Sequence, residues 1–108
     1  MKIYSKVIAM VKSVCALSRK VQQHDPDLAR QMRRACMSVA LNMLEGWHAR
    51  AGNRVARFGI AMSEARETVG CLDVSAAVGY LTDAEIAEDL DRLDHIVAVL
   101  WKLSRTRT

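Results

Sequence analysis

Apolar residues recur in four segments of this chain at alternating steps of three and four positions, and short polar turns separate the segments. Such steps average about 3.5 residues, so each row predicts an apolar stripe along one side of an α-helix. The rows are Ile3, Val7, Met10, Val14, Leu17 and Val21; Leu28, Met32, Ala35, Val39 and Met43; Val55, Phe58, Met62, Ala65, Val69, Leu72 and Ala76; and Ile86, Leu90, Leu93, Val97 and Leu100. Only other helices can hide stripes of this length from water, so the pattern predicts a helical bundle.

Residues with helix-capping side chains precede three of the segments. Asp25 is placed to cap the second helix, and Pro26 suits its first position because a missing N–H leaves no partner unsatisfied there. Asn53 is expected to cap the third helix. Thr82 and Glu85 form a T-x-x-E capping box that opens the fourth helix.

Two glycines are placed to end helices, Gly46 the second and Gly79 the third. The predicted helices span about residues 3–22, 26–45, 53–78 and 83–104. Their connections are short, so consecutive helices should run antiparallel, in the order up, down, up, down. No strand pattern or linker interrupts residues 1–108, which predicts an all-α fold in a single domain.

The composition points to self-association. Apolar residues make up 51% of the 108 residues, more than one small core comfortably hides, so copies of the chain are expected to pack together as a homo-oligomer. The first and fourth helices each carry a second apolar row that could face a neighbouring copy: Tyr4, Ile8, Val11 and Cys15, and Ile96, Val99 and Leu103. No apolar run reaches the ~20 residues of a membrane span, so the expected location is the cytoplasm.

Charge is unevenly distributed along the chain. Residues 1–57 hold 11 Lys or Arg against three acids, whereas residues 58–108 hold five against nine. Six arginines, in two clusters at helical spacing, are candidates for contact with the phosphates of RNA or DNA. They are Arg30, Arg33 and Arg34 in the second helix, and Arg50, Arg54 and Arg57 around the loop that follows it. Trp47 and His48 could stack on bases.

Motifs for catalysis or metal binding are absent from the sequence. It holds no Glu-x-x-His for a di-iron bundle, no zinc pattern, no phosphate-binding loop and no nucleophile elbow. Asp91, Asp94 and His95 are interpreted as a solvated charged face. The three widely spaced cysteines have apolar neighbours and are interpreted as buried free thiols. The sequence therefore predicts no cofactor, no metal and no enzymatic activity.

Asn42 and Glu45 break the local rules of a helix. Asn42 is a poor helix former within an apolar segment, and Glu45 lies at the negative end of the second helix. Such exceptions mark either a structural network or a functional site. The expected partner of Glu45 is an arginine of the third helix or of a neighbouring subunit.

The segment QMRRACMSVALNMLEG, residues 31–46, resembles the Q-x-R-R-A…N-I-A-E-G segment of small bacterial four-helix-bundle proteins, the 23S ribosomal RNA intervening-sequence proteins. The likeness continues at residues 60–61, at Glu67 and at the Gly-Tyr-Leu of residues 79–81. The positions that match the family are Arg33, Arg34, Asn42, Glu45, Gly46, Glu67, Gly79 and Tyr80.

The resemblance implies a bundle that assembles into a ring, typically a homopentamer. The family is similar to the accessory proteins of diversity-generating retroelements, which bind nucleic acid and a reverse transcriptase. The leading hypothesis is thus a non-enzymatic oligomer that binds RNA or DNA, as adaptor to a nucleic-acid enzyme. The alternative is a protein-interaction scaffold whose arginines pair with acids of a neighbouring subunit. An enzyme would need a pocket near Asn42, Glu45 and Glu67.

Overall fold

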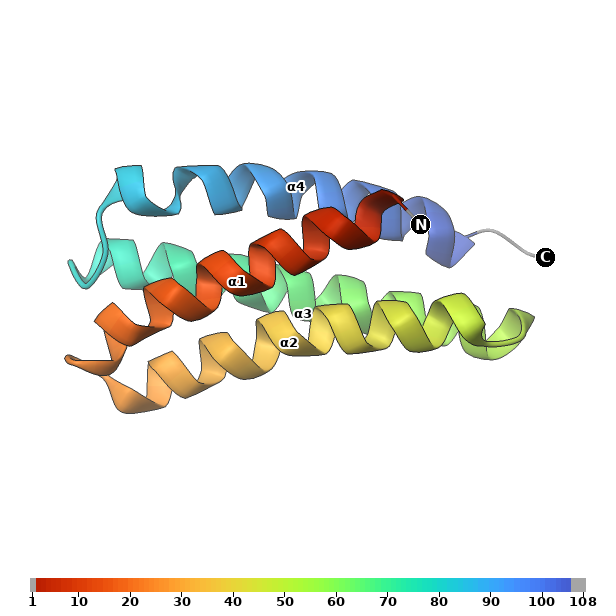
Figure 1. The fold of residues 1–108 in the computed structure, drawn as a ribbon, viewed down its shortest axis with the longest axis horizontal. Helices are drawn as coiled ribbons and strands as arrows, with labels where there is room; N and C mark the ends of the chain where they lie inside the picture. Colours follow the sequence, from red (N-terminus) through yellow and green to blue (C-terminus); the bar gives the residue numbers. More distant parts are fainter. Residues whose placement is uncertain (1, 106–108) are drawn as a thin grey trace.

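A computed structural model describes residues 2–105 and contains four α-helices there. The helices are α1 (Lys2–Gln22), α2 (Pro26–His48), α3 (Ala51–Ala77) and α4 (Asp83–Arg105). They lie side by side in alternating directions and form a rod of 44 × 22 × 19 Å (Figure 1). The all-α prediction and the up-down order are confirmed for this part of the chain.

Two of the predicted caps form as expected. The Asp25 carboxylate accepts a hydrogen bond of 3.0 Å from the backbone N–H of Leu28 at the start of α2. At the start of α4, the Thr82 hydroxyl accepts from the N–H of Glu85 at 3.1 Å, and the Glu85 carboxylate accepts from the N–H of Thr82 at 2.9 Å. These reciprocal bonds satisfy N–H groups that have no partner within the helix.

The turn after α3 contains the one described residue with a positive φ, Gly79 at 85°. L-residues with a side chain rarely adopt this conformation, so glycine suits the position. The N–H groups of Tyr80 and Leu81 then donate to the carbonyl of Ser75 at 2.9 and 3.1 Å, which closes the helix end. The prediction that Gly79 follows the third helix is confirmed.

The predicted end of the second helix is wrong. α2 continues through Gly46 to His48, only two residues connect it to α3, and Arg50 rather than Asn53 is the N-cap residue. Gly46 is buried, and a Cβ placed on it would lie 2.8 Å from the ring of Phe58. The glycine therefore serves the close approach of α2 and α3. We attribute the continuation of α2 to the burial of Phe58, which outweighs the ~1 kcal/mol helix penalty of a glycine.

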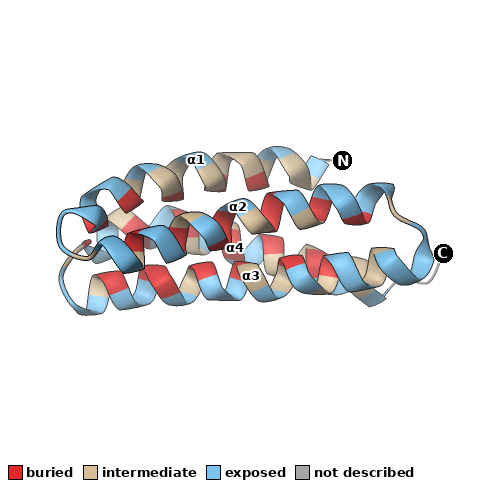
Figure 2. Ribbon diagram, turned by 90° about the horizontal axis from the view of Figure 1, so that it is seen from below, coloured by how far each residue is buried: buried red, intermediate tan, exposed pale blue. Residues whose placement is uncertain are grey.

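The core runs along the inner sides of all four helices, where the buried residues gather (Figure 2). In α3 and α4, every second residue of the predicted apolar row is buried, and the residues between them in the row are half-buried. The buried lines are Phe58, Ala61, Ala65, Thr68, Leu72 and Ser75 in α3, and Ile86, Asp89, Leu93, Ile96 and Leu100 in α4. The sequence rows thus lie slightly to one side of the true core faces.

The second rows of α1 and α4 are not the most exposed apolar surface. Tyr4, Ile8, Val11 and Cys15 are all half-buried, and Ile96 is fully buried. Instead, besides Trp47, five of the eight exposed large apolar side chains lie on α2 and α3, and a sixth belongs to Val78, directly after α3. We call these six residues the α2–α3 apolar face. They are Met37, Leu41, Leu44, Ile60, Val74 and Val78.

No helix in the described part of the chain is long and apolar enough to cross a membrane. The cysteines are free thiols, as predicted; Cys36 and Cys71 are buried and Cys15 is half-buried. The Sγ atoms of Cys15 and Cys36 lie 3.8 Å apart between α1 and α2. Burial, reinforced by the Cys15 thiol, raises the pKa of Cys36 to about 12, and burial also raises the pKa of Cys71.

Candidate nucleic-acid interface

One end of the rod brings together the start of α1, the α2–α3 turn and the end of α4 (Figure 1). In the stretches 2–9, 45–57 and 95–105, all within the described residues, there are seven Lys or Arg and one carboxylate, Glu45. The cations of this basic end are Lys2, Lys6, Arg50, Arg54, Arg57, Lys102 and Arg105. In the stretches 19–30 and 73–88 at the opposite end, six carboxylates face three cations. The charge asymmetry of the sequence therefore becomes an asymmetry along the rod.

Two exposed tryptophans lie at the basic end, each beneath a guanidinium group. The Arg54 guanidinium carbon lies 5.4 Å from the ring centre of Trp47, which is 40% exposed, and 5.8 Å from that of Phe58. The Arg105 guanidinium carbon lies 4.4 Å from the ring centre of Trp101, which is 47% exposed. Cation–π contacts of this kind hold the arginines against the rings and leave ring surface open to solvent.

The Trp101–Arg105 pair was missed by the sequence interpretation. Its signal was present, because residues four apart on a helix face the same side. Arg54 was predicted, but not as a stacked side chain; its Nε atom is buried and has no hydrogen-bond partner among the described residues. The guanidinium group is thus held by its contacts with the rings of Trp47 and Phe58.

Arg57 joins α3 to α2. Its Nε donates to the Glu45 carboxylate at 3.0 Å, and one terminal nitrogen donates to Oδ1 of Asn42 at 3.2 Å. The Asn42 amide nitrogen in turn donates to the Ser38 carbonyl at 2.9 Å. The prediction that an arginine of the third helix pairs with Glu45 is confirmed. This network makes Arg57, Asn42 and Glu45 a structural joint rather than an open site.

Arg50 differs from the other two arginines around the turn in the absence of a side-chain partner among the described residues. It is exposed at the N-cap of α3 and makes no side-chain hydrogen bond or ion pair within the described chain. A phosphate approaching this end would therefore meet Arg50 without displacing a carboxylate. The N-terminus of α3, where the first backbone N–H groups lack helical partners, adds favourable potential for an anion.

The other predicted cluster lies apart from the basic end. Arg30 pairs with Asp27 at 2.7 Å, and Arg33 reaches Ser18 Oγ and Gln22 Oε1 on α1 at 3.4 and 3.3 Å. Arg34 is exposed and has no such partner in residues 2–105. Along α2, Arg34 and Arg50 are separated by about 24 Å at 1.5 Å per residue. One subunit therefore does not unite the two arginine clusters in a single surface.

The remaining family-matched residues lie elsewhere. Glu67 is exposed on α3. Tyr80 stacks on His24 with the ring centres 5.0 Å apart and nearly parallel, which ties the α3–α4 turn to the α1–α2 turn. Together with Gly79, this contact stabilises the acidic end of the rod.

No metal-binding cluster is present among residues 2–105. They contain no group of three or more His, Cys, Asp or Glu side chains that could hold a metal ion. The pKa of Glu85 is lowered because Lys20 and the backbone N–H of Thr82 donate hydrogen bonds to its carboxylate, which is the capping contact described above. The buried carboxylate of Asp89 accepts hydrogen bonds from Ser13 and Arg92.

Comparison with known proteins gives a family and a fold. The family model described as 23S rRNA-intervening sequence protein matches residues 1–102. A crystal structure of a protein of unknown function from the S23 ribosomal protein family of Bacteroides thetaiotaomicron superposes with a TM-score of 0.88 at 19% identity, covering 96% of this chain and 99% of the other. None of the curated proteins matches.

Proposed function

This chain belongs to the family of 23S rRNA-intervening sequence proteins, and on that basis we propose that it is a self-associating, non-catalytic bundle that contacts RNA or DNA through its basic end. The family's name links it to ribosomal RNA, which makes single-stranded RNA the first ligand to test. A nucleic-acid enzyme is the proposed protein partner. The cationic residues named above supply the affinity, since they release counterions when they meet phosphates.

The observation that carries the proposal is the pair of exposed tryptophans within the basic end. Proteins that bind single strands combine a cationic surface with aromatic rings on which bases stack. Trp47 and Trp101 offer such rings, and the arginines above them lie within reach of the adjoining phosphates. Arg50 adds an unpaired cation beside the α3 N-terminus. The proposal therefore rests on Arg50, Arg54 and Arg105 more than on Arg30, Arg33 and Arg34.

Self-association is supported by the α2–α3 apolar face. Its Leu41 and Val78 side chains are more than half exposed, and exposed large apolar side chains on a small protein favour contact between copies. A ring, such as the homopentamer that the family resemblance implies, would repeat the basic end in every subunit. Repetition raises avidity for a polyanion without any new contact.

A salt titration tests the nucleic-acid proposal. Fluorescence anisotropy of a labelled RNA of about 20 nucleotides, measured between about 50 and 200 mM KCl, should show affinity falling with a log–log slope of about −0.7 per phosphate contacted. Arg50→Ala should weaken binding and make the slope shallower. The matched variant Arg34→Ala, an exposed arginine near the other end, should change both much less. Absence of binding at low salt would exclude the proposal.

A protein-interaction scaffold with no nucleic-acid role is the second candidate, and the α2–α3 apolar face favours it equally. In that case the basic end would pair with carboxylates of a neighbouring subunit, such as Asp91 or Asp94. Arg50→Glu separates the two candidates, because the Arg50 side chain makes no hydrogen bond or ion pair within residues 2–105. For a scaffold, sedimentation should show the oligomer dissociating. For a nucleic-acid-binding protein, the oligomer should persist while RNA affinity falls.

A further inference from the structure

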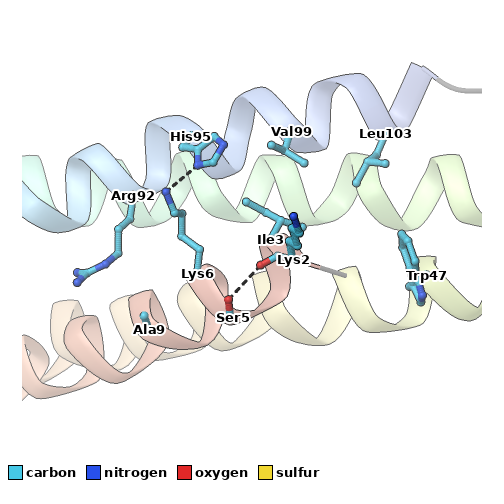
Figure 3. Close-up of a pocket in the computed structure, with 10 residues that line it drawn as sticks. All are labelled: Lys2, Ile3, Ser5, Lys6, Ala9, Trp47, Arg92, His95, Val99 and Leu103. Atoms are coloured by element: carbon cyan, nitrogen blue, oxygen red, sulfur yellow. Dashed lines mark hydrogen bonds between the residues drawn. The ribbon is translucent and has the colours of Figure 1, made fainter.

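A groove of about 750 Å³ opens between the first half of α1 and the second half of α4 (Figure 3). Ile3, Val99 and Leu103 form its apolar floor, and Trp47 of α2 stands at one end. Nothing in the proposed contact with nucleic acid uses this floor, because apolar side chains offer no donors to phosphates. The apolar floor of the groove is therefore distinct from the basic end, although Lys2 and Lys6 of the basic end also line the groove and Trp47 lies between the two.

The groove exists because α1 presents small side chains to α4 at this point. Ser5 and Ala9 line it from α1 and leave the space between the helices unfilled. Farther along the same seam, the helices are joined by polar contacts: Ser13 donates to Asp89, and Lys20 pairs with Glu85. α1 and α4 are thus in contact toward the acidic end of the rod and are separated by the groove toward the basic end.

The rim of the groove is cationic. Lys2, Lys6 and Arg92 line it, and no carboxylate belongs to the lining. Arg92 is engaged by Glu88 and Asp89, and Lys6 donates to His95 Nδ1 at 2.8 Å. Lys2 makes no ion pair within the described residues. An occupant that places carboxylates beside Lys2 and Lys6 would gain charge-assisted contacts that this chain does not supply.

From this combination we infer that the groove binds an amphipathic α-helix of a partner protein, with an apolar face and acidic residues along its edge. On α4 the lining runs from Arg92 to Leu103, about 16 Å or three helical turns, which suits such a ligand. A second copy of this chain does not suit the groove. The acidic hollow between α3 and α4, rimmed by Asp73, Asp91 and Asp94, has the complementary charge but is itself concave.

Peptide binding tests the inference. The probe is a synthetic helix of about 15 residues with leucines at alternating three-four spacing and glutamates on both flanks, and its counterpart carries lysines in place of the glutamates. In the full chain with Trp101→Phe, Trp47 emission reports on the groove. The glutamate peptide should shift it saturably, and the lysine peptide should bind at least tenfold more weakly. Equal binding of both peptides, or no binding of either, would overturn the inference.

Two variants locate the site. Ala9→Leu fills the groove and should weaken binding of the glutamate peptide at least tenfold, whereas Ala56→Leu, the same change at an exposed position of α3, should leave it unchanged. The double change Lys2→Glu and Lys6→Glu should reverse the preference toward the lysine peptide. This second variant alters surface charge, so the test stands even where Ala9→Leu disturbs folding. An unchanged preference would refute the role of the rim.

The inference does not depend on nucleic-acid contact, and the two can fail separately. Loss of RNA binding with peptide selectivity retained would remove only the proposed function. Loss of peptide selectivity with salt-dependent RNA binding retained would remove only the helix-binding groove. RNA titrations of Ala9→Leu and Arg50→Ala beside the wild type complete the comparison.

Discussion

The ring of Phe58 occupies the space that a side chain at Gly46 would need, since a Cβ on Gly46 would lie 2.8 Å from two ring carbons. Phe58 is fully buried, so displacing its ring would disturb the packed core. Gly46→Ala should therefore lower the free energy of unfolding by about 1–2 kcal/mol, the cost of overpacking less the gain in helix propensity. Urea unfolding followed by circular dichroism measures the change.

Gly70 provides the matched control for this substitution. It lies on the exposed side of α3, and a Cβ placed on it meets nothing within 4 Å. Gly70→Ala should raise the free energy of unfolding by about 0.5–1 kcal/mol, because only the helix-propensity gain remains. A stabilising effect of both substitutions would show that the contact of α2 with α3 at Gly46 is loose.

The buried Cys36 thiol should make stability fall in alkaline solution. Its pKa is about 12, above the ordinary 9.0, so between these values the folded state keeps a proton that the unfolded state releases. The contribution is present below about pH 9 and is lost as the pH rises toward 12. Urea unfolding of the wild type and of Cys36→Ala at about pH 8 and pH 10.5 measures this effect. Between the two pH values, the free energy of unfolding should fall more for the wild type than for Cys36→Ala.

Thr82 and Glu85 should stabilise the start of α4. Thr82→Ala is expected to cost about 1 kcal/mol, as for other N-cap residues, whereas Thr82→Ser should retain most of the stability.

The pKa of Glu85 is lowered in the folded state, so the stability that its carboxylate contributes is present above about pH 4.5 and is lost as the pH falls below that value. The difference between wild type and Glu85→Gln should accordingly shrink on acidification from about pH 6 to pH 3. A constant difference would contradict the lowered pKa.

The ion pair between Arg57 and Glu45 should contribute little energy. Both side chains are about half exposed, and exposed pairs are screened by solvent. A double-mutant cycle with Glu45→Ala and Arg57→Ala should give a coupling energy below about 1 kcal/mol. Arg57→Ala should cost more than Glu45→Ala, because it also removes the hydrogen bond to Asn42.

The exposed tryptophans should contribute to RNA affinity by stacking. Trp47→Ala and Trp101→Ala are each expected to cost about 1–3 kcal/mol of binding to single-stranded RNA, whereas Trp101→Phe should retain part of the affinity. Anisotropy titrations at fixed salt measure the loss. Unchanged affinity in both alanine variants would leave only phosphate contacts and would remove the stacking component of the proposal.

Much of the fold could be predicted because its signals are local. The alternation of three and four, the Asp25 cap and the Thr82–Glu85 capping box each depend on residues within one or two turns. The end of α2 could not be predicted in this way. Gly46 has the residue type of a helix stop, and its actual role depends on Phe58, twelve positions later on another helix.

The candidate site was predicted unevenly for the same reason. The partner of Glu45 followed from an unfavourable charge at a helix end, and Arg57 meets that expectation. The sequence also contained Trp101 and Arg105 one helical turn apart, but their importance depends on their position beside the α2–α3 turn. The separation of Arg34 from Arg50 required the length of an uninterrupted α2.

Both ends of the described chain, at Lys2 and Arg105, lie toward the end of the rod that holds the α2–α3 turn. A polypeptide attached next to Lys2 or Arg105, such as an affinity tag, would start at the cationic end of the rod, near the groove. Acidic tags would therefore compete with the ligands being assayed. A fluorophore attached at Ala84, an exposed position in the first turn of α4 at the far end of the rod, would report on binding without obstructing it.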